Sequence, residues 1–345
     1  MIRLLRIILF PISIIYALIM WLRNRLYDWR LLKSTAFKFP VVVIGNLAVG
    51  GTGKSPMAEY ILRLINPHKD IMLLSRGYGR KTKGFREVSI HDSAALVGDE
   101  PLQIKRKFGS TQVYVCEDRV FALNKIGSSG SGVLLDDAYQ HRALKPSFSI
   151  LLFDYKSLLK PMLPLPTGNF RDTLLESKRA SLIVVTKCPH RTDQKIRRLI
   201  EQKLQQYTTA PIFFSAISYQ QLQNSQGQAL PLAAISTYQA LLITGIAKPA
   251  PLRDHLSSHL QQLTHINFKD HHTFSAADLD AIKTDFAALK CDDKIIITTE
   301  KDYQRLPESF INTFPVYTVP IEQRILFGGQ ALFDSLLLRA FNIQS

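Results

Sequence analysis

Short apolar runs alternate with longer amphipathic stretches along most of this chain. The runs are rich in Val, Ile and Leu, which favour strands, and the stretches between them have the spacing of helices. This alternation predicts an α/β fold with a mostly parallel sheet and helices on both of its faces. In the first part of the chain, the runs predict strands at 41–44, 71–74, 113–116, 133–135, 149–154, 181–186 and 211–217.

A change in composition divides the chain near residue 217. Residues 218–238 are rich in Gln, Ser and Asn, which marks a boundary. A second α/β alternation follows, so we expect a larger domain over 34–217 and a smaller α/β domain over 218–345. The later elements are strands near 240–244, 264–268, 294–298 and 315–319, and helices near 249–260, 275–289 and 328–342.

The first 33 residues have a different pattern. Residues 7–22 form an apolar run that contains Pro11 and has basic residues on both sides. A membrane span usually needs about 20 apolar residues, so this run is short for one. We expect a membrane-associated helix within 1–33, held in one leaflet with its basic residues at the lipid headgroups. A cleaved signal peptide and a buried core helix are the alternatives.

Basic residues outnumber acidic ones, and the formal net charge is +15. Such a surface favours anionic partners, which include nucleic acids, anionic lipids and phosphorylated substrates. The chain has no RNP-like motif, zinc knuckle or concentrated basic helix, so we expect no nucleic-acid partner. Its three cysteines are far apart and indicate neither a disulfide framework nor a metal site, which favours a reducing cytoplasm.

The strongest chemical signal follows the first predicted strand. Residues 41–56 read VVVIGNLAVGGTGKSP, in which a strand leads into a glycine-rich turn and Lys-Ser opens a helix. This order is typical of a phosphate-binding P-loop, although Ala48 stands where the general pattern has Gly. We expect the Lys54 ammonium on the β- and γ-phosphates and the Ser55 hydroxyl on Mg²⁺. The residues expected to bind the nucleotide are Val49, Gly50, Gly51, Thr52, Gly53, Lys54 and Ser55.

Two carboxylates end the strand predicted at 133–135. Asp136 and Asp137 have the position of the second half of a P-loop site, where a carboxylate serves Mg²⁺ directly or through water. Residues 140–142, which read QHR, follow at the sheet edge where doubly wound folds bind ligands. ATP is favoured over GTP, because residues 186–189 read TKCP and lack the Asp of a guanine-binding N/T-K-x-D motif.

Histidines elsewhere are further candidates. Residues 268–274 read FKDHHTF, and His271 and His272 follow a predicted strand, where catalytic groups tend to lie. Their spacing alone does not separate a catalytic role from an ordinary surface loop. His255 and His259 are one helical turn apart but lack an H-E-x-x-H motif, so we expect them to be solvated or packed.

Nine stretches of the chain together resemble one family. They resemble the tetraacyldisaccharide 4'-kinases, the lipid A kinases of Gram-negative bacteria, whose P-loop likewise lacks the distant glycine. The departures are Ala138, where Gly is usual, and the NFRD ending at 169–172, which leaves the role of Asp172 open. The nine stretches are VGGTGKSP (49–56), LSRGYGR (74–80), VGDEP (97–101), DR (118–119), LLDDAYQHR (134–142), PLPTGNFRD (164–172), GIAKP (245–249), FKDHHTF (268–274) and TEKD (299–302).

The resemblance implies a P-loop NTPase-like kinase that uses ATP and Mg²⁺. Its acceptor would be the 4'-hydroxyl of an acylated glucosamine disaccharide 1-phosphate in lipid A biosynthesis. The protein would be peripheral or monotopic at the cytoplasmic face of the inner membrane, an anionic surface. Asp99 is implied to be the catalytic base, paired with His271, and Asp136 and Asp137 are implied to be the metal carboxylates. Further active-site or substrate contacts are implied for Glu100, Arg119, Gln140 and Arg171, and Gln140 is expected to contact the nucleotide.

The chemistry of the acceptor agrees with these implied roles. A sugar hydroxyl has a pKa far above 7, so a carboxylate must take its proton as the phosphoryl bond forms. His271 lies in the second predicted domain, so we expect the domains to close over ATP and bring it to Asp99. Two other classes stay open. A membrane-associated P-loop ATPase switch would hydrolyse ATP without an acceptor, and a non-enzymatic basic membrane adaptor would not need Lys54.

Overall fold

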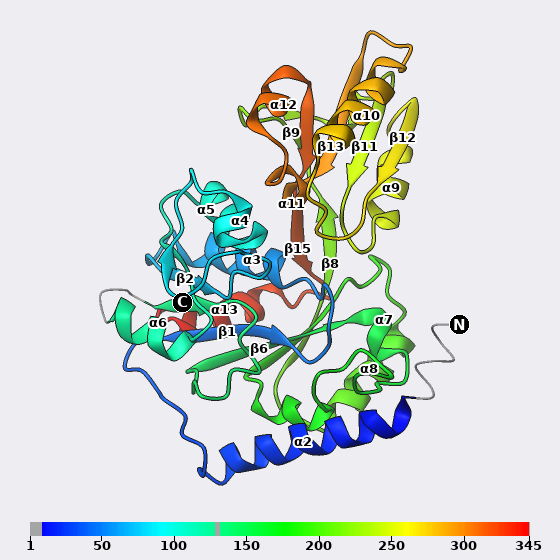
Figure 1. Ribbon diagram of the computed structural model, residues 1–345. Helices are drawn as coiled ribbons and strands as arrows, with labels where there is room; N and C mark the ends of the chain where they lie inside the picture. Colours follow the sequence, from blue (N-terminus) through cyan, green and yellow to red (C-terminus); the bar gives the residue numbers. More distant parts are fainter. Residues whose placement is uncertain (1–8, 128–131, 345) are drawn as a thin grey trace.

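The fold is built on two sheets, which Figure 1 shows one above the other. This computed structural model describes residues 9–127 and 132–344. The first two residues of the apolar run 7–22 therefore lie outside the described residues. The larger sheet occupies the lower part of Figure 1, and the smaller sheet stands over it.

The large sheet is mostly parallel and is centred on β1 (Val41–Asn46). Its strand order is β15-β8-β7-β6-β1-β5-β2-β4-β3, and every pairing from β8 to β4 is parallel. All residues of β1 are buried, as expected for a parallel strand with helices on both faces. The other strands are β2 (Met72–Ser75), β3 (Arg86–Glu87), β4 (Val113–Val115), β5 (Val133–Leu135), β6 (Phe148–Asp154), β7 (Leu182–Thr186), β8 (Ile212–Tyr219) and β15 (Ile321–Ile325).

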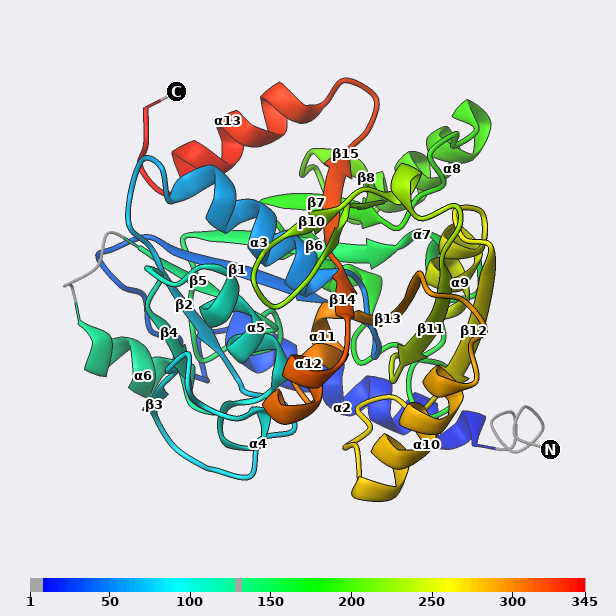
Figure 2. The same ribbon diagram turned by 90° about the horizontal axis from the view of Figure 1, so that it is seen from above.

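Helices cover both faces of this sheet and bury an apolar cluster on each. Figure 2 shows α3 and α13 on one face, with α2 (Phe10–Asp28) on the other. The strands predicted before residue 217 are all present, and the apolar runs therefore predicted this part correctly. Its helices after α2 are α3 (Lys54–Ile65), α4 (Ala94–Val97), α5 (Asp99–Lys107), α6 (Arg119–Ile126), α7 (Tyr155–Leu158), the 3₁₀ helix η1 (Leu174–Arg179), α8 (Gln194–Gln205) and α13 (Gln330–Ala340).

The small sheet has the order β10-β9-β14-β13-β11-β12. Its central strands pair in parallel, and the short β9 and β10 form an antiparallel edge. The strands are β9 (Leu222–Gln223), β10 (Ala229–Leu230), β11 (Gln239–Thr244), β12 (Gln262–Asn267), β13 (Lys294–Thr299) and β14 (Val316–Val319). The helices are η2 (Leu232–Ala234), α9 (Ala250–Ser257), α10 (Ala276–Ala287), α11 (Glu300–Tyr303) and α12 (Glu308–Thr313).

The end of the chain returns to the large sheet, which corrects the division predicted from sequence. Residues 218–345 were expected to form one smaller domain, whereas β15 pairs antiparallel with β8 and α13 packs on α3. The side chain of Phe333 in α13 is fully buried against Tyr60 and Phe213. The boundary failed because β15 directly follows β14, with only Pro320 between strands that join different sheets.

Helix α2 (Phe10–Asp28) turns its polar side inward and its apolar side outward. Figure 1 shows it running beneath the large sheet, on the side away from the small sheet. Ser13 and Asn24 are buried, whereas Leu18 is 60% exposed. Among the described residues, no helix is long and apolar enough to cross a membrane. The expected helix is present, and its association with a membrane stays a prediction.

Candidate active site

Charged residues gather where the parallel strands of the large sheet end. The strand β1 lies between β6 and β5, and this reversal of strand order is where doubly wound sheets bind ligands. The P-loop follows β1, the pair Asp136 and Asp137 follows β5, and Lys187 follows β7. The fold therefore brings together sets of residues that are far apart in the sequence.

The P-loop has the backbone that phosphate binding requires. Gly50 and Gly53 have φ angles of 104° and 86°, in the region that favours glycine. Lys54 begins α3, so unpaired N–H groups and the positive end of the helix dipole face the loop. The Lys54 Nζ atom lies 3.5 Å from Asp137 Oδ1, which ties the loop to the acidic pair.

Ala48, the departure from the general P-loop pattern, serves packing. It is 9% exposed and pairs with Phe170 in an isolated β-bridge. The next N–H, that of Val49, donates to the Asn169 carbonyl at 2.7 Å. The φ of Ala48 is not positive, so this position does not need glycine. The segment 164–172 therefore lies against the P-loop instead of acting as a free linker.

Polar side chains from neighbouring strands support the loop. Asn46 Nδ2 donates to Thr52 Oγ1 at 2.8 Å, and Thr186 Oγ1 donates to the Thr52 carbonyl at 2.7 Å. Lys187 Nζ donates to the Gly51 carbonyl. The Gln140 side-chain amide, expected to contact the nucleotide, donates to the Asn46 carbonyl at the end of β1. The TKCP stretch that lacks a guanine-binding Asp thus fastens the P-loop through its first two residues.

The acidic pair fits a magnesium ion. Asp136 is 4% exposed, and its Oδ1 atom has no hydrogen-bond partner within the described part of the chain. Among the same residues, no cluster of three acidic, His or Cys side chains could hold a metal by itself. Mg²⁺ commonly takes one or two carboxylates and completes its shell with phosphate oxygens and water. Asp136, Asp137 and the Ser55 hydroxyl match this chemistry, since a cation would give the buried Asp136 Oδ1 atom the partner that it lacks.

The two carboxyl groups of the pair differ in proton affinity. Burial and the nearby Glu100 carboxylate raise the pKa of Asp136. Burial also acts to raise the pKa of Asp137, but the Lys54 and Arg171 charges outweigh it and lower that pKa. Asp137 is therefore the member of the pair that stays ionised without a metal.

Asp99 and His271 come from the parts of the fold built on different sheets, and they contact each other. Asp99 begins α5, and His271 lies in the loop after β12, where its Nδ1 atom is 3.0 Å from Asp99 Oδ2. His271 has a φ of 59°, and its N–H donates to the Gly245 carbonyl at 3.1 Å. The predicted pair is therefore formed in this structure, and the closure of two domains over ATP stays a prediction.

Arg305, which the sequence analysis missed, also holds Asp99. Arg305 Nε donates to Asp99 Oδ1 at 3.0 Å, and Arg305 Nη2 donates to Asp99 Oδ2. Burial acts to raise the pKa of Asp99, but hydrogen bonds from His271 and Arg305 lower it to about 2. Lys301 Nζ lies 3.2 Å from Glu100 Oε1 beside this contact. The TEKD stretch ends three residues before Arg305, but no spacing rule connects position 305 with position 99.

Two predicted arginines lie at Asp137. Arg171 Nη2 donates to Asn46 Oδ1 at 2.7 Å and lies 3.3 Å from Asp137 Oδ1. Arg119 is 5% exposed and donates to the Asp137 carbonyl at 3.2 Å. Asp172 lies elsewhere, because both of its carboxylate oxygens accept from Asn24 Nδ2 of α2, at 3.1 and 3.0 Å. The structure thus gives Asp172 a role in fastening α2.

The other histidine pair is packed, as expected. The ring of His255 stacks on Tyr219 with centroids 4.4 Å apart, and the rings of His255 and His259 are 4.9 Å apart. Burial lowers the pKa of His255. This cluster lies outside the site.

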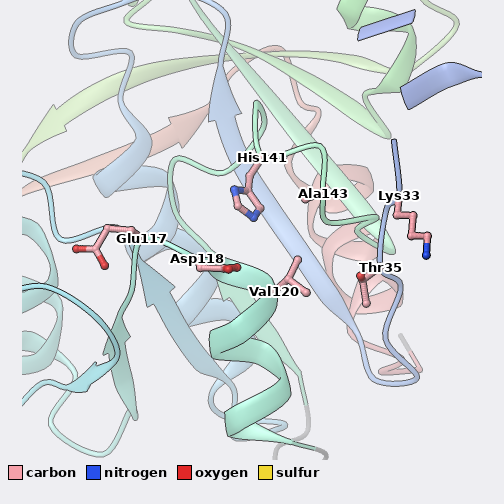
Figure 3. A pocket seen from close by; sticks show the side chains of 7 residues that line it. All are labelled: Lys33, Thr35, Glu117, Asp118, Val120, His141 and Ala143. Carbon is pink, nitrogen blue, oxygen red and sulfur yellow. The ribbon is translucent and has the colours of Figure 1, made fainter. Parts of the chain in front are cut away.

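A pocket of about 500 Å³ opens around the residues that flank Arg119 (Figure 3). Its walls come from the segment after α2, the start of α6 and the loop after β5. His141 Nε2 is buried and has no hydrogen-bond partner among the described residues. The lining residues are Lys33, Thr35, Glu117, Asp118, Val120, His141 and Ala143.

Comparisons with known proteins agree over nearly the whole chain. The family model of LpxK, described as tetraacyldisaccharide-1-P 4'-kinase, matches residues 5–342. A tetraacyldisaccharide 4'-kinase from Bacteroides thetaiotaomicron is 38% identical over 348 residues, covering 96% of this chain and 92% of the relative. Another, from Flavobacterium johnsoniae, is 40% identical over 340 residues, covering 98% of this chain and 97% of the relative.

A solved structure shares the fold. It is the "apo" form of LpxK from Aquifex aeolicus in complex with ATP. Its TM-score to this chain is 0.77 at 28% sequence identity, and the match covers 98% of this chain and 99% of that chain.

Proposed function

This chain belongs to the tetraacyldisaccharide-1-P 4'-kinase family, and we propose that it phosphorylates a lipid at the site described above. The reaction transfers the γ-phosphoryl group of ATP to the 4'-hydroxyl of tetraacyldisaccharide 1-phosphate, a step of lipid A biosynthesis. One observation carries the proposal: a P-loop with its acidic pair lies in the same molecule as the contact between Asp99 of α5 and His271 of the loop after β12.

The P-loop side of the site binds ATP. Backbone N–H groups of the loop hold the phosphates, and the Lys54 ammonium reaches the β- and γ-phosphates. Ser55, Asp136 and Asp137 would hold Mg²⁺, which would supply positive charge to offset the negative charge of the phosphates. The ATP-bound relative and the missing guanine-binding Asp both support ATP as the nucleotide.

Asp99 acts on the acceptor. As the 4'-oxygen forms a bond to the γ-phosphorus, the bond from that phosphorus to the β,γ-bridging oxygen breaks and ADP leaves. The hydroxyl proton passes to the Asp99 carboxylate and from there to solvent. The Nδ1–H of His271 orients the carboxylate, and Arg119 and Arg171 offset the negative charge that gathers near Asp137.

The disaccharide approaches through the pocket that flanks Arg119. This pocket lies between the segment after α2, at Lys33 and Thr35, and the loop that follows the acidic pair, at His141 and Ala143. Lys33 supplies a cation for a phosphate at the wall of this pocket. On this path the acyl chains would stay beside α2 while the sugar enters the site.

The acyl chains of the proposed lipid substrate favour a membrane as the partner of α2. A helix that buries Ser13 and Asn24 and exposes Ile15 and Leu18 at 59% and 60% has the reverse of the usual burial pattern. Exposed apolar surface of this extent, next to basic side chains, suits a lipid surface with anionic headgroups. We place the protein at the cytoplasmic face of the inner membrane, bound on one side of the bilayer.

The test is transfer of labelled γ-phosphate in detergent micelles, with and without tetraacyldisaccharide 1-phosphate. The proposal predicts label on the lipid, attached at the 4'-position, and little release of inorganic phosphate without the lipid. Equal phosphate release with and without the lipid would support the ATPase switch instead. A Lys54→Ala protein that keeps full function in cells would support the non-enzymatic adaptor.

A further inference from the structure

Arg305 occupies a position that the proposed reaction does not yet explain. Its guanidinium is 6% exposed and reaches from the segment after α11 to the Asp99 carboxylate. The contact uses both Asp99 oxygens, since Nε donates to Oδ1 at 3.0 Å and Nη2 donates to Oδ2. A two-point contact of this kind fixes the plane of a carboxylate as well as its charge.

A buried carboxylate fixes Arg305 in turn. Asp302 is fully buried, and its Oδ1 accepts from Arg305 Nη1 at 3.0 Å. Asp302 Oδ2 accepts from the Gly245 N–H at 2.9 Å and from Thr299 Oγ1 at 2.7 Å. The bond that holds the guanidinium from behind therefore comes from α11, which follows β13 of the second sheet.

The same carboxylate supports the loop that holds His271. Gly245, whose N–H binds Asp302, accepts from the His271 N–H at 3.1 Å. A Cβ at Gly245 would lie 3.0 Å from Asp302 Oδ1 and 3.2 Å from the Lys269 carbonyl, so glycine permits this close approach. Asp302 thus aligns two side chains, Arg305 and His271, that meet at Asp99.

We propose that Arg305 is a positioning residue for the catalytic base. Its guanidinium, fixed by Asp302, holds the Asp99 carboxylate in the orientation in which one oxygen faces His271. The proposal rests on the proposed function, since it assigns a role at the same Asp99. Because Arg305 belongs to the second sheet and Asp99 to α5, the base is in place only while the two parts of the molecule are docked.

Charged groups on every side of Asp99 enter its titration. On α5 itself the neighbour is Glu100, and from α11 and the segment after it come Lys301 and Arg305, with Asp302 behind. The loop after β12 contributes His271 and the exposed Asp270, and Tyr78 packs on the His271 ring. Burial raises the pKa of Asp99, and the hydrogen bonds and charge of Arg305 oppose that effect. Without Arg305 the pKa of Asp99 should therefore rise from about 2. The Asp99 carboxylate then becomes protonated, and so stops acting as a base, at a higher pH than in the wild type.

The test compares Arg305→Gln, Arg305→Lys and Gln304→Ala. Gln304 is the matched control, because it makes a contact between the same elements, accepting from Arg106 Nη1 at 2.7 Å. Lipid phosphorylation is measured against pH, together with KM for ATP and thermal unfolding. We expect Arg305→Gln to lower kcat by about 10- to 100-fold with KM for ATP within about twofold, since misplaced groups cost this much. In the profile of kcat/KM against pH, the acidic limb of Arg305→Gln should shift to higher pH by about one unit or more.

The other two variants distinguish a role of Arg305 in positioning Asp99 from a role in holding the two parts of the molecule together. Arg305→Lys keeps the charge but not the two-point contact, so it should restore the acid limb and only part of kcat. Gln304→Ala should match wild type in both measurements. The inference is overturned if Arg305→Gln keeps the wild-type limb and kcat, or if Gln304→Ala loses as much. If Arg305→Gln fails to fold, a wild-type kcat in Arg305→Lys overturns it. Absence of lipid phosphorylation in the wild type would refute the proposed function instead.

Discussion

Lys54 of the P-loop and Asp137 of the acidic pair form a direct contact between opposite charges. Their side chains lie 3.5 Å apart, and Lys54 is a main cause of the lowered pKa of Asp137. Lys54→Ala should lower kcat for lipid phosphorylation on the order of 10²- to 10³-fold, because a preorganised donor to the transferring phosphate is lost. Steady-state kinetics measure this, with Lys83→Ala, an exposed lysine, as control. Equal activity of the two variants would exclude the role of Lys54.

The sequence predicts some residues of the site and not others, for physical reasons. The P-loop is read from sequence because strand, turn and helix are contiguous, so local spacing fixes the geometry at Gly50, Gly53 and Lys54. Resemblance, not spacing, pointed to Asp99 with His271. Neither spacing nor resemblance identified Arg305, because its partner Asp99 lies 206 positions away. Only the docking of the two sheets brings these residues together.

At the scale of elements, α2 is fastened by a buried carboxylate. Asn24 Nδ2 donates to both oxygens of Asp172, and burial raises the pKa of Asp172 although Asn24 acts to lower it. Asn24→Ala should lower the free energy of unfolding by about 2–3 kcal/mol at pH 7.5, because a charged acceptor loses its donors. Urea unfolding measures the change, with the exposed Leu22→Ala as control.

The pH dependence of this loss has a definite sign. A carboxyl group whose folded pKa is raised binds its proton more readily in the folded state, so its contribution to stability grows as pH falls. In Asn24→Ala the pKa of Asp172 rises further, and protonation relieves the missing hydrogen bonds. The destabilisation should therefore be smaller at pH 5 than at pH 7.5. A loss that is larger at pH 5 would contradict this account of Asp172.

The return of α13 to the large sheet leads to a stability prediction. Phe333 is fully buried against Tyr60 of the helix that begins at the P-loop, with ring centroids 5.6 Å apart. Phe333→Ala should cost about 3–5 kcal/mol of unfolding free energy through lost packing and a cavity. Leu332→Ala, at a neighbouring position that is 58% exposed, should change it by less than about 0.5 kcal/mol. Denaturant titration that gives equal losses would show that α13 is not docked as described.

Sequence patterns predicted where the helices and strands lie along the chain better than which other elements they pack or pair with. Helix 328–342 was expected and α13 is present, but nothing in its periodicity says which sheet it covers. The strand β15, with the sequence IEQRI, has polar residues between its apolar ends and gives no strong strand signal. Its register with β8 depends on where β14 ends, which only the tertiary fold determines.

For the molecule as a whole, the exposed apolar face of α2 leads to a prediction about membrane binding. Replacing both Ile15 and Leu18 by Glu should weaken binding to vesicles of phosphatidylglycerol and phosphatidylethanolamine by about tenfold or more. Each apolar side chain buried in lipid contributes about 1.5–3 kcal/mol, and the new charges add repulsion. Vesicle sedimentation measures binding. The control is Leu199→Glu on α8, since Leu199 is 61% exposed but lies off this face.

The same variants separate binding to membranes from catalysis. Activity on lipid dispersed in detergent should stay near that of wild type in all of them, because the exposed side of α2 does not contact Asp99 or the P-loop. Unchanged vesicle binding in the double variant would contradict the proposed membrane face. Composition and net charge pointed to an anionic partner, but only the fold shows which apolar side chains of α2 are exposed.

The central claim is that Asp99 takes the proton of a lipid hydroxyl at a P-loop site, and single-turnover transfer tests it most directly. Labelled ATP and tetraacyldisaccharide 1-phosphate are mixed with wild type or Asp99→Asn, and the affinity for ATP is measured in parallel. We predict label on the lipid with wild type and a rate lower by about 10²- to 10⁴-fold with Asp99→Asn, at an unchanged affinity for ATP. Transfer at the wild-type rate by Asp99→Asn would contradict the mechanism, and label found only as inorganic phosphate would contradict the function.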